Sequence, residues 1–88
     1  MKEMSFTTEA WQDYLYWQTQ DKKTLKRINL LLKDISRDYY SGLGRPEALK
    51  YGRQGEMSRE IDEKNRLVYE IISETQFRVK SCKDHYDD

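Results

Sequence analysis

The spacing of apolar residues changes at a glycine-rich segment, and this change determines the fold class. Before the segment, apolar residues recur every three or four positions, which predicts a helix face made of Leu25, Ile28, Leu31, Leu32, Ile35 and Tyr39. After Gly55 the apolar residues alternate or form short runs, which predicts strands. Helices followed by strands are typical of an α+β fold. We therefore expect an N-terminal helix hairpin packed on a small antiparallel β-sheet.

Two helices are predicted in the first half, after a short strand over residues 2–6. Thr7 or Thr8 can cap the first helix, and Glu9 would lie favourably in its first turn. Asp21 can cap the second helix, and so short a connection predicts an antiparallel pair. The spacing predicts that one face of the first helix carries Trp11, Tyr14, Leu15 and Gln18.

Three strands are predicted in the second half, within "EMSREID", "RLVYEIIS" and "QFRVKSC". The short turns "DEKN" and "SET" between them predict an antiparallel meander, with the helix hairpin covering one face. The last strand would end at Cys82. His85 and Tyr86 would then lie just beyond a sheet strand rather than on a loose tail.

Length and composition predict one globular domain over residues 1–88. The chain has seven Tyr, two Trp and two Phe, more aromatic residues than a disordered chain carries. No apolar run is long enough for a signal peptide or a bilayer span, and Cys82 is the one cysteine. These features predict a cytoplasmic protein without a membrane partner, a metal or another cofactor. Cys82 is more typical of a buried filler than of a nucleophile.

Basic residues are concentrated in one part of the chain, although the formal net charge is zero. The segment 22–37 contains one acidic residue, Asp34, and these basic ones: Lys22, Lys23, Lys26, Arg27, Lys33 and Arg37. A basic surface of this kind can track phosphates. A solvated helix face explains the pattern equally well, and composition does not separate the two interpretations.

The residues with catalytic potential come from separate segments: Glu47, Arg59, Arg66, His85 and Tyr86. Glu47 lies in "SGLGRPEALKYGRQG", the one long irregular stretch, and such loops in small domains are usually functional or disordered. Each residue also has a structural alternative. Glu47 could pair with Arg45 or Lys50 in water, Arg66 could brace the hairpin turn, and His85 could be solvated.

Four stretches together resemble the YoeB/Txe family of bacterial toxins, within the RelE superfamily: "AWQDYLYWQTQDKKTLKRINLLLKDI", "GLGRPEALK", "SREIDEKNRLVYE" and "SCKDHY". The resemblance runs from Trp11 to Tyr86 and implies a microbial-ribonuclease-like fold. It further implies a ribosome-dependent endoribonuclease that cuts mRNA in the A site without a metal. The implied partners are a YefM-type antitoxin, the ribosome and a second copy of the chain.

The resemblance also implies roles for single residues. Glu47 would take the proton from a ribose 2′-hydroxyl, and Arg66 would neutralise the phosphate. His85 would protonate the leaving 5′-oxygen, and Tyr86 would orient the phosphate or His85. Further RNA contacts would come from Arg45, Lys50 and Arg59. The expected ribosome-binding residues are Lys22, Lys23, Lys26 and Arg27.

Three departures from the family pattern keep a second function open. Met57-Ser58-Arg59-Glu60 replaces the usual Trp-Ser-Arg-Arg, Asn65 replaces a frequent histidine, and Asp87-Asp88 extend the terminus. Alternation places Glu60 opposite to Arg59, where we expect the acidic residue to be harmless, and the two aspartates should raise the pKa of His85. The alternative is a catalytically impaired module that binds ribosome and antitoxin and acts in operon autorepression.

Overall fold

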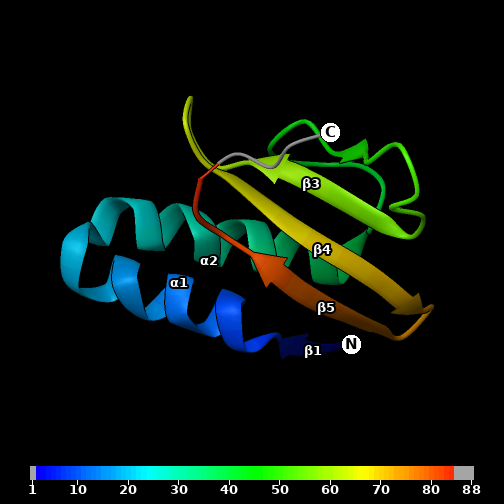
Figure 1. Cartoon of the computed structure of the whole chain (residues 1–88), viewed down its shortest axis with the longest axis horizontal. Helices are drawn as coiled ribbons and strands as arrows, with labels where there is room; N and C mark the ends of the chain where they lie inside the picture. The colour runs from blue at the N-terminus through cyan, green and yellow to red at the C-terminus, as the bar shows by residue number, and fades with distance from the viewer. Residues whose placement is uncertain (1, 85–88) are drawn as a thin grey trace.

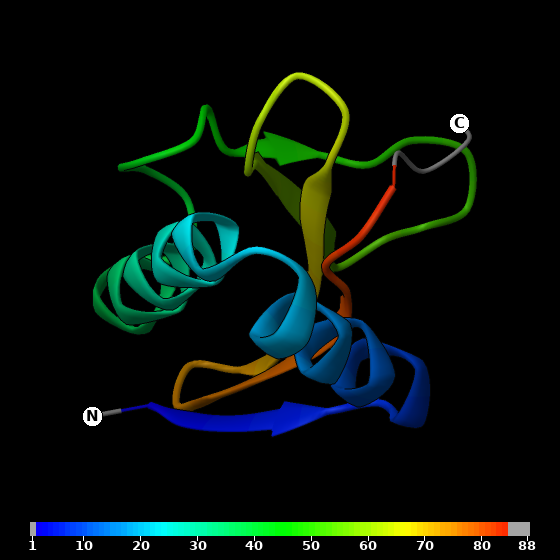
Figure 2. The ribbon, with the colours of Figure 1, turned by 90° about the vertical axis from the view of Figure 1, so that its left-hand side faces the viewer.

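Both helices lie on one face of a five-stranded sheet in the computed structural model, which describes residues 2–84 (Figure 1 and Figure 2). The elements in chain order are β1 (Glu3–Phe6), α1 (Thr8–Gln20), α2 (Lys22–Arg37), β2 (Glu47–Ala48), β3 (Glu56–Glu60), β4 (Arg66–Ser73) and β5 (Gln76–Ser81). The predicted α+β class, with a helix hairpin on a small sheet, is confirmed.

The strand order is β1-β5-β4-β3-β2. Strands β3, β4 and β5 form the predicted antiparallel meander, whereas β1 pairs with β5 in parallel, so that the sheet is mixed. Strand β1 satisfies the outer edge of β5: Thr7 N donates to Val79 O at 3.0 Å, and Glu3 N donates to Thr75 O at 2.7 Å. The glycine-rich segment contributes one further pairing, because β2 lies antiparallel to β3.

The predicted helix caps are confirmed. Thr7 Oγ1 accepts a hydrogen bond from Ala10 N at 3.1 Å, and Asp21 Oδ1 accepts from Lys23 N at 3.0 Å. Each side chain thereby satisfies a backbone N–H group that has no partner within its helix.

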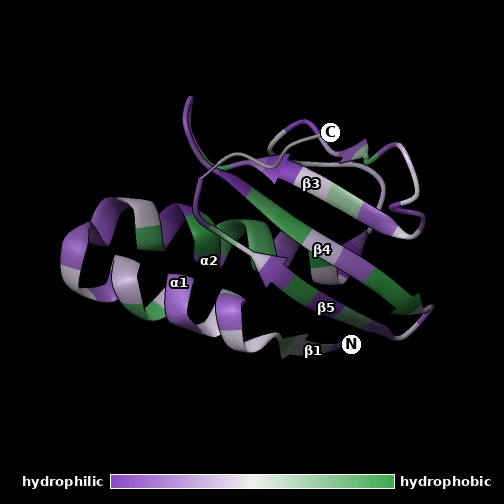
Figure 3. Cartoon of the chain, in the orientation of Figure 1, coloured by the Kyte–Doolittle hydropathy of each residue, from purple (hydrophilic) through white to green (hydrophobic). Residues whose placement is uncertain are grey.

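The core lies between α2 and the meander. The predicted apolar stripe of α2 is confirmed, and it packs against the inward-facing side chains of β4 and β5, among them Leu67, Tyr69, Phe77 and Val79. Figure 3 shows apolar residues along α2 and β4. The face of α1 that carries Trp11, Tyr14 and Leu15 is only partly buried. The buried residues of α1 are Ala10 and Trp17, while Trp11 is 48% and Leu15 40% exposed. The Trp17 indole N–H donates to Cys82 O at 2.8 Å, which turns this side of α1 towards β5.

Between residues 2 and 84, neither helix is both long and apolar enough to cross a membrane.

Candidate active site

The side of the sheet opposite to the helices places Glu47 near Ser58. Glu47 on β2 pairs with Ser58 on β3, and Ser58 pairs in turn with Val68 on β4. Paired residues point to the same face of a sheet. The face opposite to the helices therefore carries Glu47 beside Ser58, and Arg66 shares this face because it lies two residues before Val68.

Arg66 connects β4 to β3 and to the glycine-rich loop. Its Nε donates to Ser58 Oγ at 3.0 Å, and its Nη2 donates to Arg45 O at 3.4 Å. The guanidinium is thus held over Ser58, the residue paired with Glu47. The structure brings two of the expected catalytic residues together, Glu47 and Arg66, and adds Ser58 between them. The sequence did not single out Ser58, because β2 is too short to reveal its pairing partner.

The chain beyond β5 is tied to the start of β4. Asp84 N donates to Asn65 Oδ1 at 2.7 Å, and Arg66 N donates to Asp84 O at 3.0 Å. Further back, Cys82 N donates to Asp13 Oδ2 at 3.1 Å. Asp84, the residue before His85 in the sequence, is therefore fixed beside Arg66. His85, Tyr86, Asp87 and Asp88 lie outside the described residues.

Left-handed backbone conformations occur on both sides of Arg66. Arg45 has a φ of 51° and Asp84 a φ of 64°, which is uncommon for residues other than glycine. Both residues contact Arg66 through their carbonyl oxygens. Such backbone strain persists only where surrounding contacts hold it, and it gathers at functional sites.

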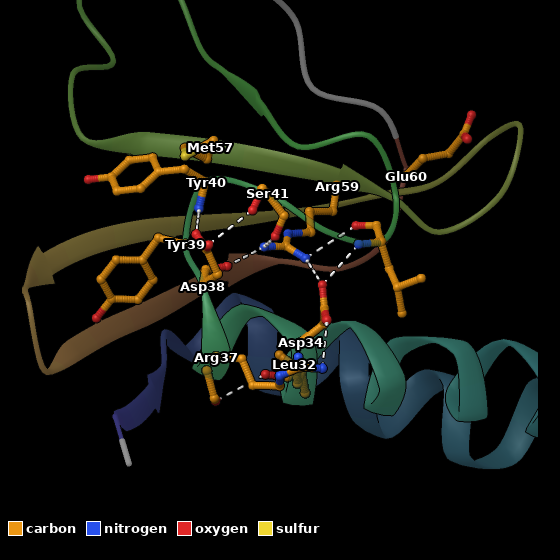
Figure 4. A network of polar contacts seen from close by, with 12 residues as sticks. Leu32, Asp34, Arg37, Asp38, Tyr39, Tyr40, Ser41, Met57, Arg59 and Glu60 are labelled. Atoms are coloured by element: carbon orange, nitrogen blue, oxygen red, sulfur yellow. Dashed lines mark hydrogen bonds and ion pairs between the residues drawn. The ribbon is translucent and has the colours of Figure 1, made fainter.

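Arg59 does not belong to this surface, and the prediction that it contacts RNA was wrong. It alternates with Ser58 along β3, so its side chain enters the helix-facing side of the sheet and is fully buried. Nη1 donates to Asp34 Oδ2 at 2.5 Å, and Nη2 donates to Asp38 O at 2.6 Å and to Ser41 O at 3.2 Å (Figure 4). Arg59 therefore holds the segment that follows α2 against β3 instead of facing a substrate.

The carboxylate of this network is held in its charged form. Asp34 Oδ2 accepts from Leu43 N at 2.9 Å, and this bond, followed by the Arg59 guanidinium, keeps the pKa of Asp34 below its ordinary value. Gly42 has a φ of +126°, and a Cβ there would overlap the Asp34 carboxylate. The loop that carries Glu47 thus starts from a backbone that only glycine fits.

Glu60 lies on the site face, which corrects the reason for expecting it to be harmless. It does point away from Arg59, but Arg59 is the buried residue of the two. Glu60 pairs with Arg66 across β3 and β4, so its carboxylate lies on the same face as the candidate site. An acidic residue there opposes an approaching phosphate.

The other basic candidates lie around this face or on α2. Arg45 and Lys50 flank Glu47 on the loop and are exposed. Lys22, Lys23 and Lys26 are exposed on the first turns of α2. Arg27 is half-buried, because its Nη2 donates to Glu60 O at 3.3 Å.

Cys82 is a buried filler, as expected. Burial raises the pKa of the Cys82 thiol to about 12, so it is a poor nucleophile near neutral pH. Across residues 2–84 no three side chains of His, Cys, Asp or Glu are grouped so that they could hold a metal ion.

Comparisons with known proteins assign the family. The family model described as "YoeB-like toxin of bacterial type II toxin-antitoxin system" matches residues 6–86. Toxin YoeB of Synechocystis sp. is 48% identical over 83 residues, which are 94% of this chain and 95% of that protein. The YoeB/ParE toxin structure from Agrobacterium tumefaciens superposes with a TM-score of 0.90 at 37% identity, covering 98% of this chain and 100% of that one.

The toxin in a heterotetrameric YoeB-YefM toxin-antitoxin complex from Staphylococcus aureus has a TM-score of 0.86 at 41% identity. That match covers 98% of this chain and 99% of the other. The chain therefore belongs to the family of YoeB-like toxins of bacterial type II toxin-antitoxin systems.

Proposed function

We propose that this toxin is a ribosome-dependent endoribonuclease that cuts mRNA in the A site through attack of a ribose 2′-hydroxyl. The observation that carries the proposal is the Arg66 guanidinium, held by Ser58 next to Glu47, with Asp84 fixed to the Arg66 backbone. A carboxylate and a fixed cation thus lie on one face of the sheet. Asp84, which precedes His85 in the sequence, is bonded to the backbone of that cation's residue, Arg66.

In this mechanism Glu47 is the general base, and it takes the proton from the 2′-hydroxyl as the oxygen attacks phosphorus. Arg66 stabilises the charge that develops on the phosphate oxygens. His85 gives a proton to the departing 5′-oxygen, and Tyr86 orients the phosphate or the imidazole. These protein groups supply the base, the acid and the cation of the reaction without a metal. General acid–base catalysis of this kind contributes about 10²–10⁴-fold for each group.

The ribosome supplies concentration and alignment. A chain with zero net charge has little attraction for free RNA, and Glu60 weakens it further at the site. Fixing the message in place can lower the barrier by about 7–11 kcal/mol. We assign ribosome contact to the exposed lysines Lys22, Lys23 and Lys26, while Arg45 and Lys50 are assigned to the message. This activity belongs in the cytoplasm.

A YefM-type antitoxin is the proposed regulator, and a homodimer is the proposed free state. Related toxins from Staphylococcus aureus are known as a YoeB dimer and in a YoeB-YefM complex. This chain is 42% and 41% identical to the toxin chains of those structures, over nearly their whole length.

The test is to map the 5′ ends of messages cut in a reconstituted translation reaction. Wild-type protein should cut within the A-site codon, and His85→Ala should cut at least about 10²-fold more slowly. Equal cutting by both proteins would remove His85 from the mechanism. Ribosome binding without cutting by either protein would favour the impaired binding module, for which the position of Glu60 is the supporting observation.

A further inference from the structure

A groove of about 640 Å³ lies on the helix-covered side of the sheet, away from the candidate active site. It forms where β1, at the edge of the sheet, runs beside both helices. We call it the β1 groove. Its principal lining residues are Met4 and Phe6 of β1, Trp11 and Tyr14 of α1, and Lys33 and Arg37 of α2.

The aromatic side chains of the groove are ordered by packing against one another. Phe6 packs edge-on against Trp11 and Tyr14 at ring-centroid distances of 5.8 and 5.7 Å, and Trp11 stacks on Tyr14. The Tyr14 hydroxyl donates to Asn29 Oδ1 at 2.7 Å, and this bond joins α1 to α2 beside the groove. Even so, Met4 is 46% and Trp11 48% exposed. Large rigid side chains of this kind anchor protein partners at low entropic cost.

The charges of the groove indicate what covers it. Lys33 and Arg37 are the charged lining residues, and the described part of the chain places no carboxylate among the others. The fitting occupant is apolar on one side and acidic at its rim. A second copy of this chain fits poorly, because a two-fold contact through this patch would bring the two basic pairs together.

We propose that the β1 groove binds an amphipathic segment of the antitoxin, with apolar side chains on Phe6 and Trp11 and carboxylates on Lys33 and Arg37. This inference rests on the antitoxin regulation proposed above, and it adds the place of contact. An antitoxin bound in the β1 groove contacts the side of the sheet opposite to Glu47 and Arg66.

Met4 provides a matched pair of variants. Its side chain is half-exposed on an edge strand, so that Met4→Glu and Met4→Lys lose the same apolar contact and differ in charge. A second pair, Lys33→Glu and Lys64→Glu, makes the same charge reversal inside the groove and on the exposed β3–β4 turn. The binding partner is a purified YefM-type antitoxin, and calorimetry measures its Kd.

We expect Met4→Glu to weaken binding about tenfold more than Met4→Lys does, and Lys33→Glu about tenfold more than Lys64→Glu. In NMR spectra the indole N–H signal of Trp11 should move on binding more than that of the buried Trp17. Equal affinities within both pairs, with a bound wild type, would overturn the groove and leave the proposed function intact.

If wild-type protein does not bind the partner, the proposed antitoxin regulation fails, and the groove assignment fails with it. If Met4→Glu leaves antitoxin affinity unchanged but dissociates the free toxin in sedimentation, the occupant is a second copy and the proposal is wrong.

Discussion

Replacing Asp34 by Asn removes one charge from the buried network around Arg59 and changes little else in shape. In the wild-type protein Arg59 is fully buried and pairs with Asp34 at 2.5 Å. The variant leaves the guanidinium with carbonyl oxygens and the Tyr69 hydroxyl but without the carboxylate that pairs with it. Asp34→Asn is therefore expected to destabilise the whole fold, and the loop that leads to Glu47 first.

The size of the effect follows from burial. Breaking a buried ion pair by removing one partner costs about 3–5 kcal/mol. Asp34 keeps 15% of its side-chain surface exposed, which places the expected loss at the lower end, about 3 kcal/mol. A protein of this size holds roughly 5–15 kcal/mol in total, and each kcal/mol shifts Tm by about 4–8 °C. The variant should still fold at 25 °C and melt well below the wild type.

A double-mutant cycle with Arg59→Met tests the reasoning. Once the buried cation is gone, Asp34→Asn no longer breaks the buried ion pair, so its added cost should fall below about 1 kcal/mol, a coupling of about 2 kcal/mol. Urea unfolding followed by the fluorescence of the buried Trp17 gives all four free energies of unfolding. If the costs of the two substitutions simply add, Arg59 and Asp34 do not act as a pair and the account of the network is wrong.

Four further outcomes are expected. Glu60→Gln should speed cleavage severalfold by removing a carboxylate from the site face, measured with single-turnover kinetics, and a slower variant would contradict the placement. Charge reversal of Lys22, Lys23 and Lys26 should abolish ribosome pelleting at about 0.1 M salt while preserving Tm, and unchanged pelleting would reject this face. Cys82 should react with thiol reagents only after denaturation, and rapid labelling of the native protein would contradict its burial. Because the pKa of Asp34 is lowered in the folded protein, its charge stabilises the fold above the unfolded pKa, and this stability is lost as pH falls below about 4. Asp34→Asn should therefore lose less stability on acidification than the wild type. Equal losses of unfolding free energy in both proteins would contradict this.

The sequence was sufficient where local patterns decide the structure. The stripe of α2, the caps Thr7 and Asp21, and the three meander strands each depend on residues close together in the chain. The burial of Trp17 on α1 was not predicted, because it depends on a hydrogen bond to the carbonyl of Cys82, 65 positions away. Apolar spacing alone does not contain that contact.

Arg59 shows the same limit at the site. An arginine on an alternating strand is typical of an exposed charge, and the family pattern made a substrate role plausible. Its burial depends on Asp34, 25 positions earlier, and on loop carbonyls exposed by the turn at Gly42. The pairing of Glu47 with Ser58 depends in turn on a two-residue strand, too short to leave a pattern. The association of Glu47 with Arg66 could therefore be guessed from the family but not from spacing.

The central claim is that a ribose hydroxyl of the message attacks its own phosphate under the control of Glu47 and Arg66. The most direct measurement uses a message with a single 2′-deoxynucleotide at the mapped cleavage position, bound in the ribosomal A site. The account predicts that this message stays intact while the all-ribose message is cut and leaves a 2′,3′-cyclic phosphate. Cleavage of the deoxy message at an undiminished rate would contradict the mechanism.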